Sequence, residues 1–149
     1  RSLSSYQTAS NLSPFYNPFI ESDFAYRQAV YANVTEDQSQ AQEHVKEADK
    51  KAQKADKSTI NNLIVKRRIA NTYLLLAKID KSFEEKAIEK GQDLLKLAPT
   101  DPQSYLTLAK IQAGIGQKEK AQETLSLALL LKPDYLEAQQ LFEQLTTNN

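Results

Sequence analysis

The chain has 149 residues, 40% of them hydrophobic and 26% charged, so it is long enough for one folded domain and too apolar for general disorder. Lysine plus arginine balance aspartate plus glutamate at 19 each, which gives no electrostatic attraction for nucleic acid. Cysteine is absent, which excludes disulfides and thiolate metal ligands, and no apolar run approaches the roughly 20 residues of a membrane helix. With only 3 glycines, the chain is predicted to be all-α.

Two helices are predicted in the first third of the chain, over residues 2–12 and 20–33. Tyr6, Ala9 and Pro14 have a spacing that returns in the C-terminal half, at Leu125, Ala128 and Pro133. Residues 1–12 therefore look like the second helix of a pair whose first helix lies upstream. We expect the chain to be a piece of something longer.

Half of the 12 aromatic residues lie close together near the N-terminus. They are Phe15, Tyr16, Phe19, Phe24, Tyr26 and Tyr31. A platform that stacks against a ligand such as a sugar ring is one interpretation. The favoured interpretation is the core of an atypical terminal repeat.

The next helix is predicted over residues 36–57 and carries His44, the only histidine of the chain. His44 lies between Ala41 and Val45 on a narrow apolar stripe. Zinc needs three or four ligands, and no second histidine or cysteine exists to supply them. We therefore expect a structural role for His44, and no metal or cofactor.

The middle of the chain is predicted to form an extended helical hairpin. Six residues separate Pro99 from Tyr105, whereas twenty separate Gln53, in the matching position, from Tyr73. The fourteen extra residues amount to about four helical turns. We predict that residues 46–68 project past the rest of the fold.

The predicted hairpin is basic, with eight lysines and arginines against three acidic residues. Contact with anionic lipid headgroups or an anionic polymer, a glycan included, is one interpretation. A solvated helical tip is the other, and it is favoured. The residues assigned to the anionic contact are Lys50, Lys51, Lys54 and Lys57.

An internal repeat organises the second half. Residues 73–79 read YLLLAKI, and 32 residues later the chain reads YLTLAKI; Pro99 returns 34 residues later as Pro133. Proline ends the second helix of each pair because it cannot continue it. The predicted units are a degenerate N-terminal repeat (1–57), repeats over 69–99 and 101–133, and a capping helix (134–149). The predicted helices after residue 57 span 59–80, 83–97, 102–114, 118–131 and 134–146.

A helix–turn–helix unit of about 34 residues resembles the tetratricopeptide repeat (TPR). The residues that carry the resemblance are Tyr105, Leu108, Ala109, Gly116, Ala121, Leu125, Ala128 and Pro133. The resemblance implies a helical solenoid whose first helices line a groove for a protein or peptide partner. The groove residues that it implies are Asn71, Leu74, Lys78, Lys81, Gln103, Leu106, Lys110 and Ala113.

Most of the chain also resembles the repeat region of a particular family. Residues 12–18 read LSPFYNP, residues 97–102 read LAPTDP, and a long irregular segment separates them. This combination is similar to the C-terminal TPR region of bacterial membrane proteins of the O-antigen ligase or polymerase family. The resemblance implies membrane association through upstream segments, with the extracytoplasmic side favoured and the protein's own membrane domain as a partner.

Two hypotheses about function remain open. In the first, the chain is a non-catalytic interaction or scaffold module, the tail of such a membrane protein. In the second, it is a free-standing adaptor, for example in the cytoplasm, that binds a peptide in its groove. No set of nucleophile, base and acid converges in the sequence, so we expect no enzyme activity.

Overall fold

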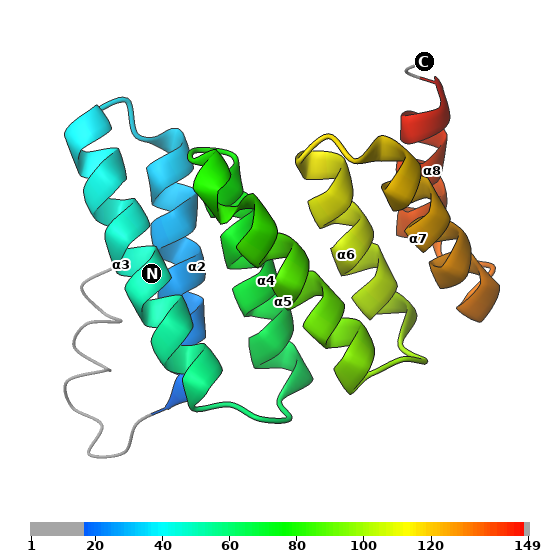
Figure 1. Ribbon diagram of the computed structural model, residues 1–149, viewed down its shortest axis with the longest axis horizontal. Coiled ribbons are helices and arrows are strands. Elements are labelled where there is room, and N and C mark those ends of the chain that lie inside the picture. Colours follow the sequence, from blue (N-terminus) through cyan, green and yellow to red (C-terminus); the bar gives the residue numbers. More distant parts are fainter. Residues whose placement is uncertain (1–16, 148–149) are drawn as a thin grey trace.

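The computed structural model describes residues 17–147, and in this range all regular secondary structure is helical (Figure 1). The elements are α2 (Pro18–Val34), α3 (Gln38–Lys57), α4 (Leu63–Ala77), a 3-10 turn η1 (Lys81–Phe83), α5 (Glu84–Leu97), α6 (Pro102–Gly114), α7 (Lys118–Leu131) and α8 (Leu136–Thr147). The predicted all-α fold is confirmed for these residues. The helix predicted over residues 2–12 lies outside the described part of the chain.

Several helices begin at a residue whose side chain accepts a hydrogen bond from the free backbone N–H groups of the first turn. These capping residues are Asn17, Asp37, Asn62 and Asp101. Pro18 and Pro102 follow two of them, at positions where no backbone N–H is needed. The predicted bounds of α6 and α7 are those observed, and the other predicted bounds in the described range differ by at most four residues.

The helices pack as sequential antiparallel pairs, α2 with α3, α4 with α5 and α6 with α7, while α8 packs against α7. Figure 1 shows these pairs side by side, from α2 and α3 at one end to α8 at the other. One apolar core extends from α2 to α6, and a second one joins α6, α7 and α8. The arrangement is consistent with a helical repeat array.

The second helix of each pair buries the same three positions, spaced i, i+4 and i+7 along one helical face. The three sets are Ala48, Ala52 and Ala55 in α3; Ala87, Gly91 and Leu94 in α5; and Ala121, Leu125 and Ala128 in α7. We call these three positions the seam. A Cβ atom at Gly91 would lie 2.8 Å from Leu108 Cδ1, so small seam residues allow close helix approach.

The first helices also share a buried pattern, a large residue followed by alanine and, three positions later, a polar or aromatic residue. The three sets are Phe24, Ala25 and Gln28 in α2; Ile69, Ala70 and Tyr73 in α4; and Leu108, Ala109 and Gln112 in α6. By this pattern Ala70, and not Ala77, corresponds to Ala109. The YLLLAKI and YLTLAKI segments therefore do not occupy equivalent positions. Their similarity arises because leucine and alanine suit any buried stretch of helix.

This register corrects the predicted projecting hairpin at residues 46–68. Fifteen residues separate Ala55 from Ala70, and fifteen separate Leu94 from Ala109, so no insertion lies between the pairs. Within 46–68, Ala48, Ala52, Ala55 and Val65 are fully buried. The extra residues lie inside the pairs instead: the spacing from first-helix alanine to second-helix alanine is 12 in α6–α7, 17 in α4–α5 and 23 in α2–α3.

The buried alanine of the first helices makes a packing prediction. Ala109 is fully buried, so Ala109→Leu should overpack the contact of α6 with its neighbours and lower the free energy of unfolding by about 1–3 kcal/mol. Ala113→Leu, on a partly exposed position of the same helix, is the matched control and should change stability far less. Urea unfolding followed by circular dichroism measures both; equal effects would contradict the packing.

Candidate functional site

The predicted groove residues are divided among several environments. Asn71 and Leu74 lie on α4, and Lys110 and Ala113 on α6, all partly buried, while Gln103 is exposed. Leu106 is only 2% exposed and belongs to the core of α6 to α8, so it is not a groove residue. The predicted pair of leucines therefore presents no open apolar strip between α4 and α6.

The predicted groove lysines are also in unlike positions. Lys110 forms an ion pair with Glu137 of α8, which ties the first helix of one pair to the next element. Lys78 is the exposed C-terminal cap of α4. Lys81 lies in η1 and, with α3, lines a hollow that the sequence did not predict.

An open apolar surface lies on α2. Tyr26, Val30, Tyr31 and Val34 are more than a third exposed, and Val34 is 69% exposed. They line a hollow of about 460 Å³ together with Asp23, Arg27 and Arg68. We call this the α2 surface. Its sequence signal was the spacing of Tyr26, Val30 and Val34 along one helical face.

The aromatic cluster near the N-terminus is divided between core and surface. Phe24 is 5% exposed, as expected for core, whereas Phe19 is 44% exposed. The Arg68 guanidinium lies over the Phe19 ring, 4.4 Å from its centroid. Tyr31 lies beside His44, with 5.9 Å between ring centroids. Phe15 and Tyr16 fall outside the described residues.

Polar contacts fix one edge of the α2 surface. Arg68 of α4 donates a hydrogen bond to the Phe19 carbonyl oxygen (3.3 Å), and its Nε lies 3.7 Å from Asp23 Oδ1. Asp23 also accepts a hydrogen bond from Arg27 Nε at 3.0 Å. Arg68 and Asp23 therefore join α2 to α4 along this edge of the surface.

His44 connects α3 to α2. Its Nδ1 is hydrogen-bonded to Gln28 Oε1. Gln28 occupies in α2 the position that Gln112 occupies in α6, and Gln112 accepts a hydrogen bond from Thr124 of α7. In the first and third pairs, this position therefore forms a polar link between first and second helix, whereas in the middle pair it is Tyr73, whose hydroxyl contacts Asp49 of α3. Among residues 17–147, no group of three histidine, cysteine, aspartate or glutamate side chains is arranged to hold a metal ion.

A polar network lies between α3, α4 and α5. Asp49 accepts hydrogen bonds from Tyr73 Oη and Lys86 Nζ, each at 2.9 Å, and from Gln53 Nε2 at 2.8 Å. Burial alone would raise the pKa of Asp49, but hydrogen bonds from these three residues outweigh it and hold that pKa below its ordinary value. Burial, with Asp49 beside it, raises the pKa of Tyr73, so the phenol remains a donor.

A second carboxylate of the network, Asp56, lies 2.7 Å from Lys66 Nζ and 2.9 Å from Lys90 Nζ. Burial would raise the pKa of Asp56, and hydrogen bonds from the two lysines lower it further than burial raises it. Both carboxylates join neighbouring helix pairs. The network therefore stabilises the array and offers no free acid or base.

The four lysines assigned to an anionic contact do not share one environment. Lys51 is 23% exposed and binds Glu21 of α2 at 2.9 Å; Lys54 binds the same carboxylate at 3.1 Å. Burial would raise the pKa of Glu21, but hydrogen bonds from both lysines lower it below its ordinary value. Lys50 and Lys57 are exposed, and Lys46 joins them on the outer face of α3.

The fold and its surfaces define an all-helical domain of antiparallel pairs, consistent with a helical repeat protein. Comparison with protein-family models and with curated proteins finds no match to this sequence. None of the helices within residues 17–147 is both long and apolar enough to cross a membrane.

Proposed function

We propose that this chain is a tetratricopeptide-type repeat module that binds a segment of a partner protein and carries out no catalysis itself. The observation that carries the proposal is the α2 surface. It is an open apolar hollow, whereas the seam residues of the second helices are buried. Five of the twelve large hydrophobic side chains that are exposed in the described range lie on α2. Such a concentration marks an interaction site, because single exposed apolar residues are scattered on ordinary surfaces.

The chemistry of the α2 surface favours an apolar segment with polar flanks. Tyr26 and Tyr31 offer rings with a polar tip, which are favoured at interfaces, and Val30 and Val34 offer aliphatic contact. Arg68 and Asp23 limit the hollow on the α4 side. A partner helix or extended segment would bury its apolar side chains against α2 and keep its polar side chains toward Arg68.

The test is photo-crosslinking from the α2 surface. A benzoylphenylalanine at position 34, or in a second protein at position 30, should capture the same partner from a lysate of the native cell. The control position is Leu130 on α7, which is 78% exposed but far along the array. Capture from α2 should disappear in Tyr26→Asp. Equal capture from position 130, or capture that survives Tyr26→Asp, would contradict the proposal.

For the whole protein, we propose that the module is the tail of a membrane protein of the O-antigen ligase or polymerase type. This rests on the resemblance of the segments at 12–18 and 97–102 alone. A free-standing adaptor is the alternative. Fractionation of native cells decides between them: a longer product in the membrane fraction supports the tail, and a product of this length in the soluble fraction supports the adaptor.

A further inference from the structure

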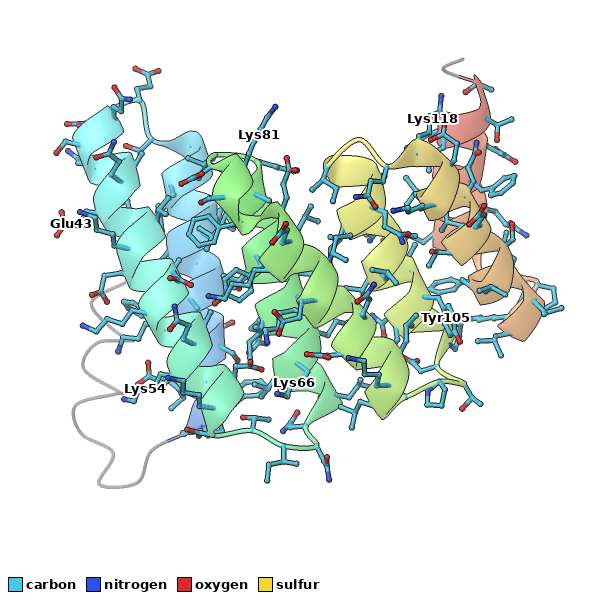
Figure 2. All side chains as sticks on the ribbon, in the orientation of Figure 1. Glu43, Lys54, Lys66, Lys81, Tyr105 and Lys118 are labelled. Carbon is cyan, nitrogen blue, oxygen red and sulfur yellow. The ribbon has the colours of Figure 1, made fainter. Side chains whose placement is uncertain are left out.

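Lysines form a regular strip along the outer face of α3. Lys46, Lys50, Lys54 and Lys57 line one hollow of about 400 Å³, with Asp49 and Gln53 as its other lining residues. Asp49 is already engaged by Tyr73 and Lys86, so the remaining charge of the hollow is positive. Lys54 shares Glu21 with Lys51 but is still 54% exposed. Figure 2 shows Lys54 near the lower end of α3.

A second hollow with an apolar part, called the apolar hollow below, adjoins the upper end of this strip. About 590 Å³ in volume, it lies between the start of α3 and the α4–α5 connection, near Lys81 at the upper edge of Figure 2. Its lining is mixed: the apolar residues are Ala41, Val45, Ile79 and Phe83, and the polar ones are Gln38, Gln42, Lys46, Asp49, Asp80 and Lys81. Lys46 and Asp49 line both hollows, so the strip and the apolar hollow are continuous.

The spacing of the lysines fits an extended chain. Four helical residues rise about 6 Å, which separates Lys46 from Lys50 and Lys50 from Lys54. In an extended chain, side chains on one side recur every two residues, about 6.6–6.8 Å. Carboxylates at alternate positions of such a chain would therefore meet successive lysines.

From this geometry we propose that the outer face of α3 binds an extended acidic segment of a partner protein. Its acidic side chains at alternate positions pair with the strip of Lys46, Lys50, Lys54 and Lys57, and an apolar side chain at one end enters the hollow beside Val45 and Phe83. A bilayer is disfavoured as the partner because the apolar side chains line a hollow, where a flat surface does not reach. This strip is separate from the α2 surface, so either site can fail without the other.

The probe is a fluorescein-labelled peptide with two leucines followed by alternating glutamate and serine, titrated by fluorescence anisotropy. The comparison peptide has the same composition with its glutamates contiguous. We expect the alternating peptide to bind at least fivefold more tightly, with affinity that falls as salt rises. Equal binding of the two peptides would overturn the proposed register.

Matched variants test the location. Lys46→Gln, Lys50→Gln and Lys57→Gln combined should weaken binding of the alternating peptide at least tenfold. The control removes three lysines elsewhere, Lys96→Gln, Lys120→Gln and Lys132→Gln, and should stay within twofold. Equal loss in the two triple variants would overturn the proposal.

Ala41→Arg tests the apolar hollow. It should fill the hollow and abolish the contribution of the two leucines to peptide affinity. Vesicles of 30% phosphatidylglycerol test the alternative partner: if they bind the protein while the peptide does not, the proposal is overturned.

Discussion

Tyr73→Ala should lower the free energy of unfolding by about 3–5 kcal/mol, the cost of deleting a large aromatic side chain from a well-packed core. Tyr73 has no exposed surface, stacks on Phe83 with 6.2 Å between ring centroids, and lies under the Lys86 ammonium at 4.6 Å. Its hydroxyl also satisfies Asp49 of the neighbouring pair. One side chain thus contributes to the apolar core and to the polar contact between pairs, and urea unfolding at neutral pH measures its loss.

Two controls separate these contributions. Tyr73→Phe keeps the ring and removes only the hydroxyl, so it should cost about 1–2 kcal/mol, because Asp49 keeps its contacts with Lys86 and Gln53. Tyr105→Ala removes a partly exposed ring at the matching place of the repeated sequence segment and should cost less than Tyr73→Ala. Equal losses at positions 73 and 105 would show that the register of the first helices is wrong.

Acid should destabilise the protein through its paired carboxylates. Glu21, Asp49, Asp56 and Asp101 each have a pKa lowered from its ordinary value in the folded protein. A lowered folded pKa means that the unfolded chain binds protons more readily. The stabilisation is therefore present above the unfolded pKa and is lost as pH falls through the folded pKa. Stability should decline below about pH 5, by up to about 1.4 kcal/mol per pH unit for each such carboxylate.

Asp56→Asn isolates one of these groups. The variant should be less stable than the wild type at pH 7, because Lys66 and Lys90 lose their shared carboxylate, and its stability should fall less steeply between pH 5 and pH 3. Asp134→Asn, at an exposed position, is the control and should follow the wild-type curve. Parallel pH curves for wild type and Asp56→Asn would show that this pair contributes nothing to acid sensitivity.

The helices could be predicted from the sequence because their signals are local. Proline, aspartate and asparagine mark the starts of α2 and α6, and the alanine and leucine spacing of α7 is that of one buried face. The bounds of α6 and α7 followed directly from these signals. The register between the repeats could not be read the same way, because a seven-residue similarity placed Tyr73 opposite Tyr105. Burial of Tyr73 shows that a local match does not decide which residues face the core.

The candidate surfaces depend on contacts distant in sequence, and most of them could not be predicted. Asp49 meets Tyr73 and Lys86 only because three helices pack together. One signal was available for the lysines of α3. Lys51 lies three residues after Ala48 and four before Ala55, on the helical face of the seam. This spacing alone predicts that Lys51 faces α2, where it pairs with Glu21. Lys46, Lys50 and Lys57 lie away from that face.

The unequal pair lengths show where this scaffold accepts new chain. From the second helix of one pair to the first helix of the next, the spacing between buried positions is constant at fifteen residues, from Ala55 to Ala70 and from Leu94 to Ala109. These connections therefore tolerate no change of length in this array. Within pairs, the spacing between the buried alanines varies by up to eleven residues because α2 and α3 are longer helices than α6 and α7, and the seam is undisturbed. An engineer who wishes to graft a peptide should therefore insert it between α2 and α3 or between α6 and α7. The connections between pairs, α3 to α4 and α5 to α6, should keep their length.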